Sequence, residues 1–213
     1  MENKSLFGLI VITILVIWGL VAWGSKTSAP SNNAATNNPQ IEKITDSDEL
    51  TIGAQNPQVQ IIEYSDVQCS ACAIANTALN QIISQNPDTV QLVYRHFPLS
   101  YHPFAKPGAL GLQAAFRQGK FREMKDALFE RQDTLNQEII NQTAQELGLN
   151  MEKYRADITD PKLISKIEQN FQKGMTLKIT GTPTIYINGA EFKNFADPRE
   201  IQKKIDEIAG EKR

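Results

Sequence analysis

Hydrophobic and polar positions change their spacing twice between residues 58 and 97. Residues 58–64 (QVQIIEY) are apolar on both sides of an extended chain, which is typical of a strand in the centre of a sheet. A helical spacing begins at Ala71 and ends before Asn86-Pro87. Residues 89–97 (TVQLVYRHF) predict a second strand. The order strand, helix, strand indicates a βαβ unit with parallel strands. The apolar positions of the predicted helix are Ile74, Ala78, Leu79, Ile82 and Ile83.

From about residue 103 to 175 every periodic segment is helical, so we expect a helical block inserted into an α/β frame. The predicted helices are FAKPGALGLQAAFRQ, KFREMKDALFERQ, NQEIINQTAQELGL and DPKLISKIEQNFQKGM. After them, residues 183–195 predict a β-hairpin that turns at Asn188-Gly189. The last helix starts at DPRE, which resembles a capping box. Its packing stripe is Ile201, Ile205 and Ile208.

The amino-terminal part has a different pattern. After a short segment of residues 1–5, residues 6–23 (LFGLIVITILVIWGLVAW) carry no formal charge and as a helix would span roughly 27 Å, close to a bilayer core. We interpret them as one transmembrane helix, an uncleaved anchor; a cleaved signal peptide is the alternative, because Ala22-Trp23-Gly24 fits a cleavage site. Residues 24–40 lack apolar periodicity and predict a flexible linker. The folded domain is then expected over residues 41–210.

Composition narrows the classes of partner. The chain has 213 residues and a formal net charge of −2, with acidic and basic residues interspersed. It therefore offers no basic stripe for phosphates, and we expect no nucleic acid partner. An anchor and a signal peptide both lead to export. With the anchor, the predicted location is the cell membrane, with a single span and the folded domain outside the cytoplasm.

Cys69 and Cys72 are the two cysteines of the chain, and they follow directly on the first predicted strand. A structural zinc site needs four ligands, and only His96 and His102 could add imidazoles, so we expect no metal. A disulfide between them would close too short a loop to stabilise the fold much. Because Cys69 lies at the predicted start of a helix, free backbone N–H groups would stabilise its thiolate, which favours redox chemistry.

Four segments, in this order and at compatible spacing, resemble the DsbA family of exported thiol-disulfide oxidoreductases. They are IIEYSDVQCSAC, RHFPLSYHPFA, QAAFRQGKFREMKDALFERQ and ITGTPTIYING. The resemblance covers roughly residues 50–210. It implies an α/β thioredoxin fold, with a central mixed sheet flanked by helices and interrupted by the helical insertion.

The resemblance also assigns roles to individual residues. Cys69 matches the exposed nucleophilic cysteine, and Cys72 matches its buried partner, with which it forms the redox-active disulfide. Thr182-Pro183 matches a loop with a cis proline that faces the cysteines, where the Thr182 backbone would bind an extended substrate. Glu63 matches an acidic residue beneath the cysteines, where a raised pKa would let it exchange a proton with Cys72; a paired or edge-facing glutamate is the alternative.

Two neighbouring features are less specific. Asp66 would suit the turn before the cysteines through local hydrogen bonds alone, and Lys106 would pair with a carboxylate or remain in solvent. Between the cysteines, Ser70-Ala71 replaces the Pro-His of the best-known DsbA pattern. We therefore expect the helix terminus to be the main cause of a low Cys69 pKa, and a protein less oxidising than a Pro-His enzyme.

The sequence thus predicts a membrane-anchored oxidase that introduces disulfide bonds into exported proteins, without a cofactor. Its expected partners are folding proteins that contain cysteines, and a membrane thiol oxidase that reoxidises it. A disulfide reductase or isomerase of the same fold is the first alternative. The second alternative is an anchored module without catalytic activity, in which the cysteines hold a metal or a partner.

Overall fold

The structure is a computed structural model, and it describes residues 49–211. The predicted anchor at residues 6–23, the predicted linker at 24–40 and the first residues of the predicted domain lie outside this range. The described residues belong to the second of two compact units, Asn37–Arg213. Within them, no helix combines the length and the apolar character needed to cross a membrane.

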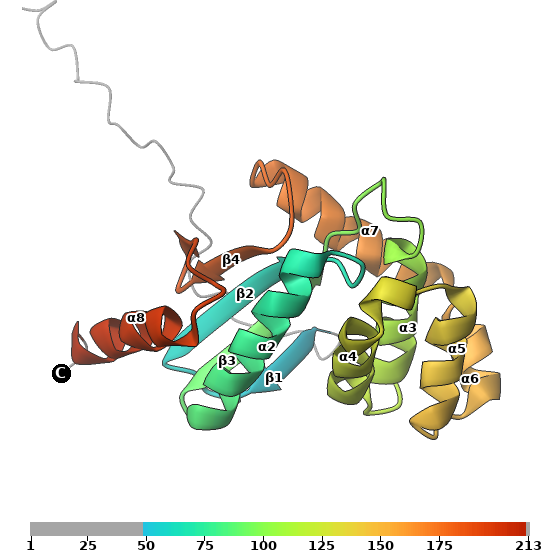
Figure 1. Cartoon of the computed structure of the whole chain (residues 1–213), viewed down its shortest axis with the longest axis horizontal. Coiled ribbons are helices and arrows are strands. Elements are labelled where there is room, and N and C mark those ends of the chain that lie inside the picture. The colour runs from blue at the N-terminus through green and yellow to red at the C-terminus, as the bar shows by residue number, and fades with distance from the viewer. Residues whose placement is uncertain (1–48, 212–213) are drawn as a thin grey trace, which may run out of the picture. The chain divides into compact units, whose positions relative to one another are not determined.

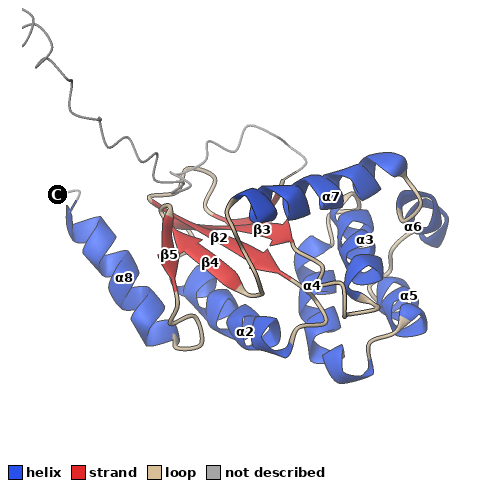
Figure 2. Ribbon diagram, turned by 90° about the horizontal axis from the view of Figure 1, so that it is seen from above, coloured by secondary structure: helices blue, strands red, loops and turns tan. Residues whose placement is uncertain are grey.

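One sheet of five strands forms the frame of the described residues. Its strands are β1 (Leu50–Gly53), β2 (Val59–Ser65), β3 (Val90–His96), β4 (Thr184–Ile187) and β5 (Ala190–Phe192). They are ordered β1-β3-β2-β4-β5 (Figures 1 and 2), and β2 and β3 are parallel while the other pairs are antiparallel. The central position of β2 explains its apolar character on both sides, because both of its faces are covered.

The predicted βαβ unit is confirmed. It consists of β2, the helix α2 (Ser70–Gln85) and β3. The predicted stripe of α2 is right at four positions, but Ile74 is wrong, because its side chain is 54% exposed. Ala75 is fully buried in its place and faces the sheet.

Helices cover both faces of the sheet. Figure 2 shows α2 and α8 (Pro198–Glu211) on one side and α7 (Pro161–Thr176) on the other. The stripe of Ile201, Ile205 and Ile208 is buried against α2 and the strands, as its spacing predicts. On the opposite side α7 approaches closely, since a Cβ at Gly174 would lie 2.7 Å from the Phe97 ring.

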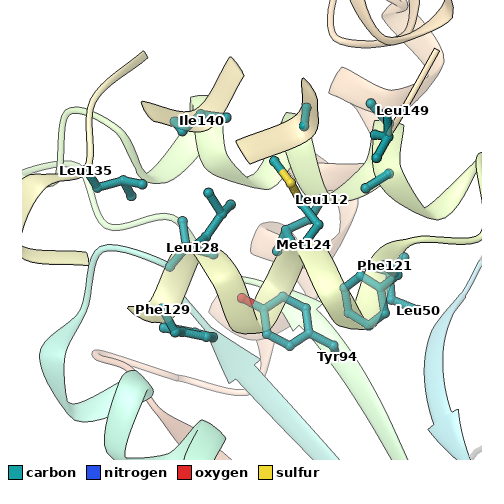
Figure 3. Packing of buried hydrophobic residues seen from close by; sticks show 14 of the residues in the cluster. Leu50, Tyr94, Leu112, Phe121, Met124, Leu128, Phe129, Leu135, Ile140 and Leu149 are labelled. Carbon is teal, nitrogen blue, oxygen red and sulfur yellow. The ribbon is translucent and has the colours of Figure 1, made fainter. Parts of the chain in front are cut away.

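Between β3 and β4 the chain is helical, which confirms the predicted insertion into a thioredoxin-like fold. Its helices before α7 are α3 (Ala105–Phe116), α4 (Phe121–Glu130), α5 (Gln137–Glu146) and α6 (Met151–Asp157). Their apolar faces meet in one core, in which Leu112, Met124, Leu128 and Ile140 are fully buried (Figure 3). Tyr94 of β3 also enters this core, so the insertion packs directly on the sheet.

Two elements of the structure are not predicted by the sequence, and one predicted turn is confirmed. β1 is unpredicted, because its four residues are too few to show a period; pairing with β3 and burial of Leu50 stabilise it. α6 is also unpredicted, since Tyr154 is its one buried residue. The hairpin turn is confirmed, with positive φ angles of 44° at Asn188 and 84° at Gly189.

Candidate thiol site at the amino end of α2

Both cysteines lie where β2 passes into α2. Cys69 is the residue that precedes the first turn of α2, and its backbone N–H donates to the Asp66 carbonyl oxygen at 3.0 Å. Its own carbonyl oxygen accepts from the Cys72 N–H at 2.9 Å. The Cys69 side chain is partly exposed, whereas Cys72 is fully buried in the core shared with the insertion. A substrate sulfur can therefore reach Cys69 first.

The pKa of Cys69 is lowered to about 5. The largest cause is a hydrogen bond from the Cys72 side chain, and backbone N–H groups of Cys72 and Ala71 at the helix terminus add to it, while burial opposes it. The sequence-based prediction that the helix terminus is the main cause of the low pKa is therefore wrong, because the Cys72 side chain contributes more. Cys69 is then a thiolate at neutral pH, the form that attacks disulfides.

Burial raises the pKa of Cys72, and its hydrogen bond to Cys69 and the charge of Glu63 raise it further. The two thiols therefore differ strongly in proton affinity although one helical turn separates them. At neutral pH the reduced site holds one thiolate and one thiol, and Cys72 has to lose a proton before it can attack.

Thr182 and Pro183 lie beside Cys69, directly before β4. The peptide bond between them is cis, as the resemblance to the DsbA family implies. The Cys69 sulfur lies 3.3 Å from the Thr182 carbonyl oxygen, to which it donates when it is protonated. Two segments more than a hundred residues apart in the sequence thus meet at the exposed sulfur.

Glu63 lies in the interior on β2, opposite Tyr94 of β3. Neither of its carboxyl oxygens has a hydrogen-bonding partner among the described residues, and the same holds for the Tyr94 hydroxyl. Burial raises the pKa of Glu63 to about 7, and the positive charge of Lys125 opposes this shift. The geometry rules out the edge-facing alternative, and a carboxyl group that titrates near neutrality suits proton exchange with Cys72.

Asp66 fixes the turn before Cys69. One of its carboxylate oxygens accepts from the Gln68 N–H at 2.8 Å, and the other lies 2.9 Å from the Leu99 N–H and 2.8 Å from Nδ1 of His102. Asp66 therefore forms the local hydrogen bonds expected of the turn, and it also binds residues of the loop after β3. Lys106 is exposed.

The two histidines have hydrogen-bonding partners other than the cysteines. His96 is buried, and burial lowers its pKa to about 3, so it is neutral and accepts from the Gln113 amide at 3.2 Å. His102 is held by Asp66. In the part of the chain that the structure describes, no three metal-binding side chains gather in one place.

Lys125 of α4 was missed by the sequence reading. Its side chain is 0% exposed, and its ammonium group donates to Asn76 and Asn80 of α2 and lies 3.4 Å from an Asp126 carboxylate oxygen. The sequence held a signal for it, because Lys125 follows Phe121 by four residues and therefore falls on the apolar face of α4.

Solved structures share the fold. A thioredoxin-like oxidoreductase from Silicibacter pomeroyi DSS-3 is 24% identical, with a TM-score of 0.69 over 78% of this chain and 94% of that one. The thiol-disulfide exchange protein alpha-DsbA2 from Wolbachia pipientis is 20% identical, with a TM-score of 0.70 over 76% and 88%. BdbD from Bacillus subtilis is 22% identical, with a TM-score of 0.64 over 76% and 92%.

Curated relatives include longer proteins. The chain is 29% identical over 154 residues to the Na(+)/H(+) antiporter NhaA of Herminiimonas arsenicoxydans, which is 72% of this chain and 24% of the antiporter. It is 32% identical over 138 residues to NhaA 3 of Salinispora tropica, which is 64% of this chain and 21% of that protein. The chain thus spans about a quarter of the length of these relatives, and the similarity concerns one segment of each.

The sequence profile of the family described as Thioredoxin matches residues 45–207, which include β1 to β5 and both cysteines. The matched residues also contain the helical insertion and the loop at Thr182-Pro183. The chain belongs to the thioredoxin family.

Proposed function

We propose that this protein is a membrane-anchored thiol-disulfide oxidoreductase that acts outside the cytoplasm and passes the Cys69–Cys72 disulfide to exported proteins. The observation that carries the proposal is the asymmetry of the two thiols: Cys69 is partly exposed and has a pKa of about 5, while Cys72 is buried and has a raised pKa. Membership of the thioredoxin family and the likeness to a thiol-disulfide exchange protein support it.

The reaction follows from this asymmetry. A substrate thiolate attacks the Cys69 sulfur, the Cys69–Cys72 bond breaks, and Cys72 takes the electron pair and then a proton. A second substrate thiolate attacks the substrate sulfur of the mixed disulfide, and Cys69 leaves as a thiolate. A low pKa makes Cys69 a good leaving group in this step. The substrate gains a disulfide and the enzyme is left reduced.

Thr182 gives the substrate a place to bind in this proposal. Its carbonyl oxygen lies 3.3 Å from the Cys69 sulfur, so the adjoining backbone can pair with an extended chain whose cysteine reacts there. Backbone pairing depends little on the substrate side chains, which suits an enzyme that acts on many unfolded proteins.

Trapping tests the thiol chemistry. In a Cys72→Ser variant residue 72 can no longer attack a mixed disulfide on Cys69, so adducts with exported proteins should accumulate and disappear on reduction. A Cys69→Ser variant is the matched control, since it keeps one thiol but loses the exposed one. If the two variants recover equal amounts of adduct, the proposed chemistry is wrong.

The direction of electron flow separates the oxidase from a reductase or isomerase. Equilibration with glutathione should give a reduction potential below that of a Pro-His enzyme, because Ser70-Ala71 offers no imidazole to the thiolate. In cells, thiol labelling should find Cys69 and Cys72 mostly oxidised, as expected of a disulfide donor reoxidised by a membrane thiol oxidase. A mostly reduced pair would point to the reductase or isomerase.

The alternative of an anchored module without catalysis makes a different prediction. Reduced protein would then bind a metal in stoichiometric amount and would not oxidise a dithiol peptide. Metal analysis beside a peptide oxidation assay therefore separates the two functions, and we expect rapid oxidation of the peptide.

A further inference from the structure

The loop after β3 is tied by hydrogen bonds to the turn that presents Cys69. This loop is residues 97–104 (FPLSYHPF), and the turn is residues 66–69. One side chain from each segment makes the central contact, in which Nδ1 of His102 lies 2.8 Å from a carboxylate oxygen of Asp66. The Asp66 side chain is 0% exposed and the His102 side chain 20%, so the contact is largely shielded from water.

The Asp66 carboxylate accepts from three donors. Two of them are the backbone N–H groups of Gln68 and Leu99, at 2.8 and 2.9 Å. Because a carboxylate oxygen only accepts, Nδ1 of His102 carries a proton and is the third donor. Of these three donors the imidazole is the one that belongs to a side chain, so a substitution can remove it and leave the backbone donors in place.

The loop fixes the direction in which Nδ1 of His102 points. The His102 N–H donates to the Leu99 carbonyl oxygen at 3.0 Å, and the Tyr101 ring packs edge-on against the imidazole with 4.5 Å between ring centroids. Two residues further on, the Phe104 N–H donates to the Gln68 side chain at 2.8 Å. The imidazole therefore meets Asp66 in a defined orientation.

Asp66 in turn holds the backbone that carries the reactive sulfur. Its carbonyl oxygen accepts from the Cys69 N–H at 3.0 Å, and its carboxylate holds the Gln68 N–H one residue earlier. The Cys69 sulfur lies 3.3 Å from the Thr182 carbonyl oxygen and receives hydrogen bonds from two backbone N–H groups at the start of α2. These partners stay close to the sulfur only while the turn keeps its shape.

We propose that His102 is a positioning residue of the thiol site: by donating to Asp66 it fixes the turn that carries Cys69. The sulfur then stays beside the Thr182 carbonyl oxygen and the amino end of α2. This inference rests on the proposed function, and it deepens that function by giving the loop after β3 a part in the reactivity of the nucleophile. His102 exchanges no proton with the thiols and acts on Cys69 only through Asp66.

Two substitutions of matched size separate the hydrogen bond from the packing of the ring. His102→Asn places an amide N–H group near the position of Nδ1, whereas His102→Leu has nearly the same shape as that amide and offers no donor. The ultraviolet absorbance of the thiolate, followed as a function of pH in the reduced full-length protein, gives the titration midpoint of Cys69. Equilibration with glutathione gives the second readout.

The donor should decide the result. We expect the wild-type protein and His102→Asn to share a midpoint near pH 5. In His102→Leu the turn loosens and the backbone donors are less well aligned with the sulfur, so the midpoint should rise by about half a pKa unit or more. The reduced form then loses stability at neutral pH, and the equilibrium constant for reduction of the protein by glutathione should fall about threefold.

A histidine with only a structural role would give a different pattern. Its loss would lower the unfolding free energy of the oxidised and the reduced protein equally, and it would leave the midpoint and the glutathione equilibrium unchanged. Denaturant unfolding of both forms measures this. Ser100→Ala, at an exposed position of the same loop, is the control and should change none of these quantities.

A double substitution tests the route through Asp66. In an Asp66→Ala background the acceptor is absent, so His102→Asn and His102→Leu should give the same midpoint, and a difference that persists there would overturn the inference. Equal midpoints of the two His102 variants in the otherwise wild-type protein would overturn it as well. A wild-type protein that does not exchange with glutathione would instead overturn the proposed function, and the midpoints would still decide the role of His102.

Discussion

At the scale of single residues, the site depends on three groups whose pKa values are shifted in different directions. Cys69 is partly exposed and receives hydrogen bonds, so its charged form is favoured; Cys72 and Glu63 are buried, so their neutral forms are favoured. These environments push the proton affinities of two like thiols apart. In the proposed function, that separation makes Cys69 the nucleophile and Cys72 the resolving thiol.

The reactivity of Cys69 tests this assignment. Alkylation of the reduced protein with iodoacetamide should modify Cys69 first, with a pH midpoint near 5. Because the Cys72 side chain is the largest cause of the low pKa, Cys72→Ala should raise that midpoint. A midpoint near the ordinary thiol value of 9.0 in the wild-type protein would contradict the assignment.

Glu63 should make the unfolding free energy depend on pH. Its pKa rises from 4.5 to about 7 on folding, so its contribution is most favourable below pH 4.5 and is lost as the pH rises through 7. Between pH 4 and 8 the oxidised wild-type protein should therefore lose up to about 3 kcal/mol of unfolding free energy relative to Glu63→Gln. Denaturant unfolding of both oxidised proteins measures the difference, and parallel pH curves would show that Glu63 is not buried as described.

At the scale of elements, the insertion supports the turn that presents Cys69. Gly108 of α3 faces Val67 of this turn, and a Cβ there would overlap the Val67 side chain. The Gln132 side chain donates to the Val67 carbonyl oxygen at 3.1 Å, and Gln68 accepts from the Phe104 N–H at 2.8 Å. Residues 104–132 thus contact the turn at three points.

Gly108→Ala should therefore disturb both stability and chemistry. We expect it to lower the unfolding free energy by about 1–3 kcal/mol, as overpacking does, and to slow alkylation of Cys69 because the turn has to shift. Gly210→Ala in α8 is the matched control, since no atom lies within 4 Å of its added Cβ, and it should be neutral or slightly stabilising. Equal effects of the two substitutions would argue against the contact with Val67.

At the scale of the whole molecule, we propose that a membrane anchor is joined to a redox domain. The run at residues 6–23 is the part of the sequence with the length and apolar character of a membrane span. The full chain should therefore stay in the membrane fraction after alkaline carbonate washing, while a chain without residues 6–23 should not. Recovery of a wild-type protein shortened near residue 24 would instead favour the signal peptide.

Much of this protein was predictable from local pattern. The βαβ unit, the helical insertion, the hairpin at Asn188-Gly189 and the last helix follow from spacing and turn residues, because each depends on neighbours in the sequence. The Cys-x-x-Cys pair at the start of α2 follows in the same way. Ile74 shows the limit of this reasoning, since several residues of α2 are apolar and spacing alone does not say which of them faces the sheet.

By itself, then, the sequence determined the two thiols and the order of the elements apart from β1 and α6. Only the tertiary structure decided what surrounds those thiols: the Thr182 carbonyl oxygen beside Cys69, the burial of Glu63, and the buried Lys125 of α4 that donates to Asn76 of α2. The reason is physical. Proton affinities depend on burial and on charges a few ångströms away, and these charges come from parts of the chain that no local pattern connects.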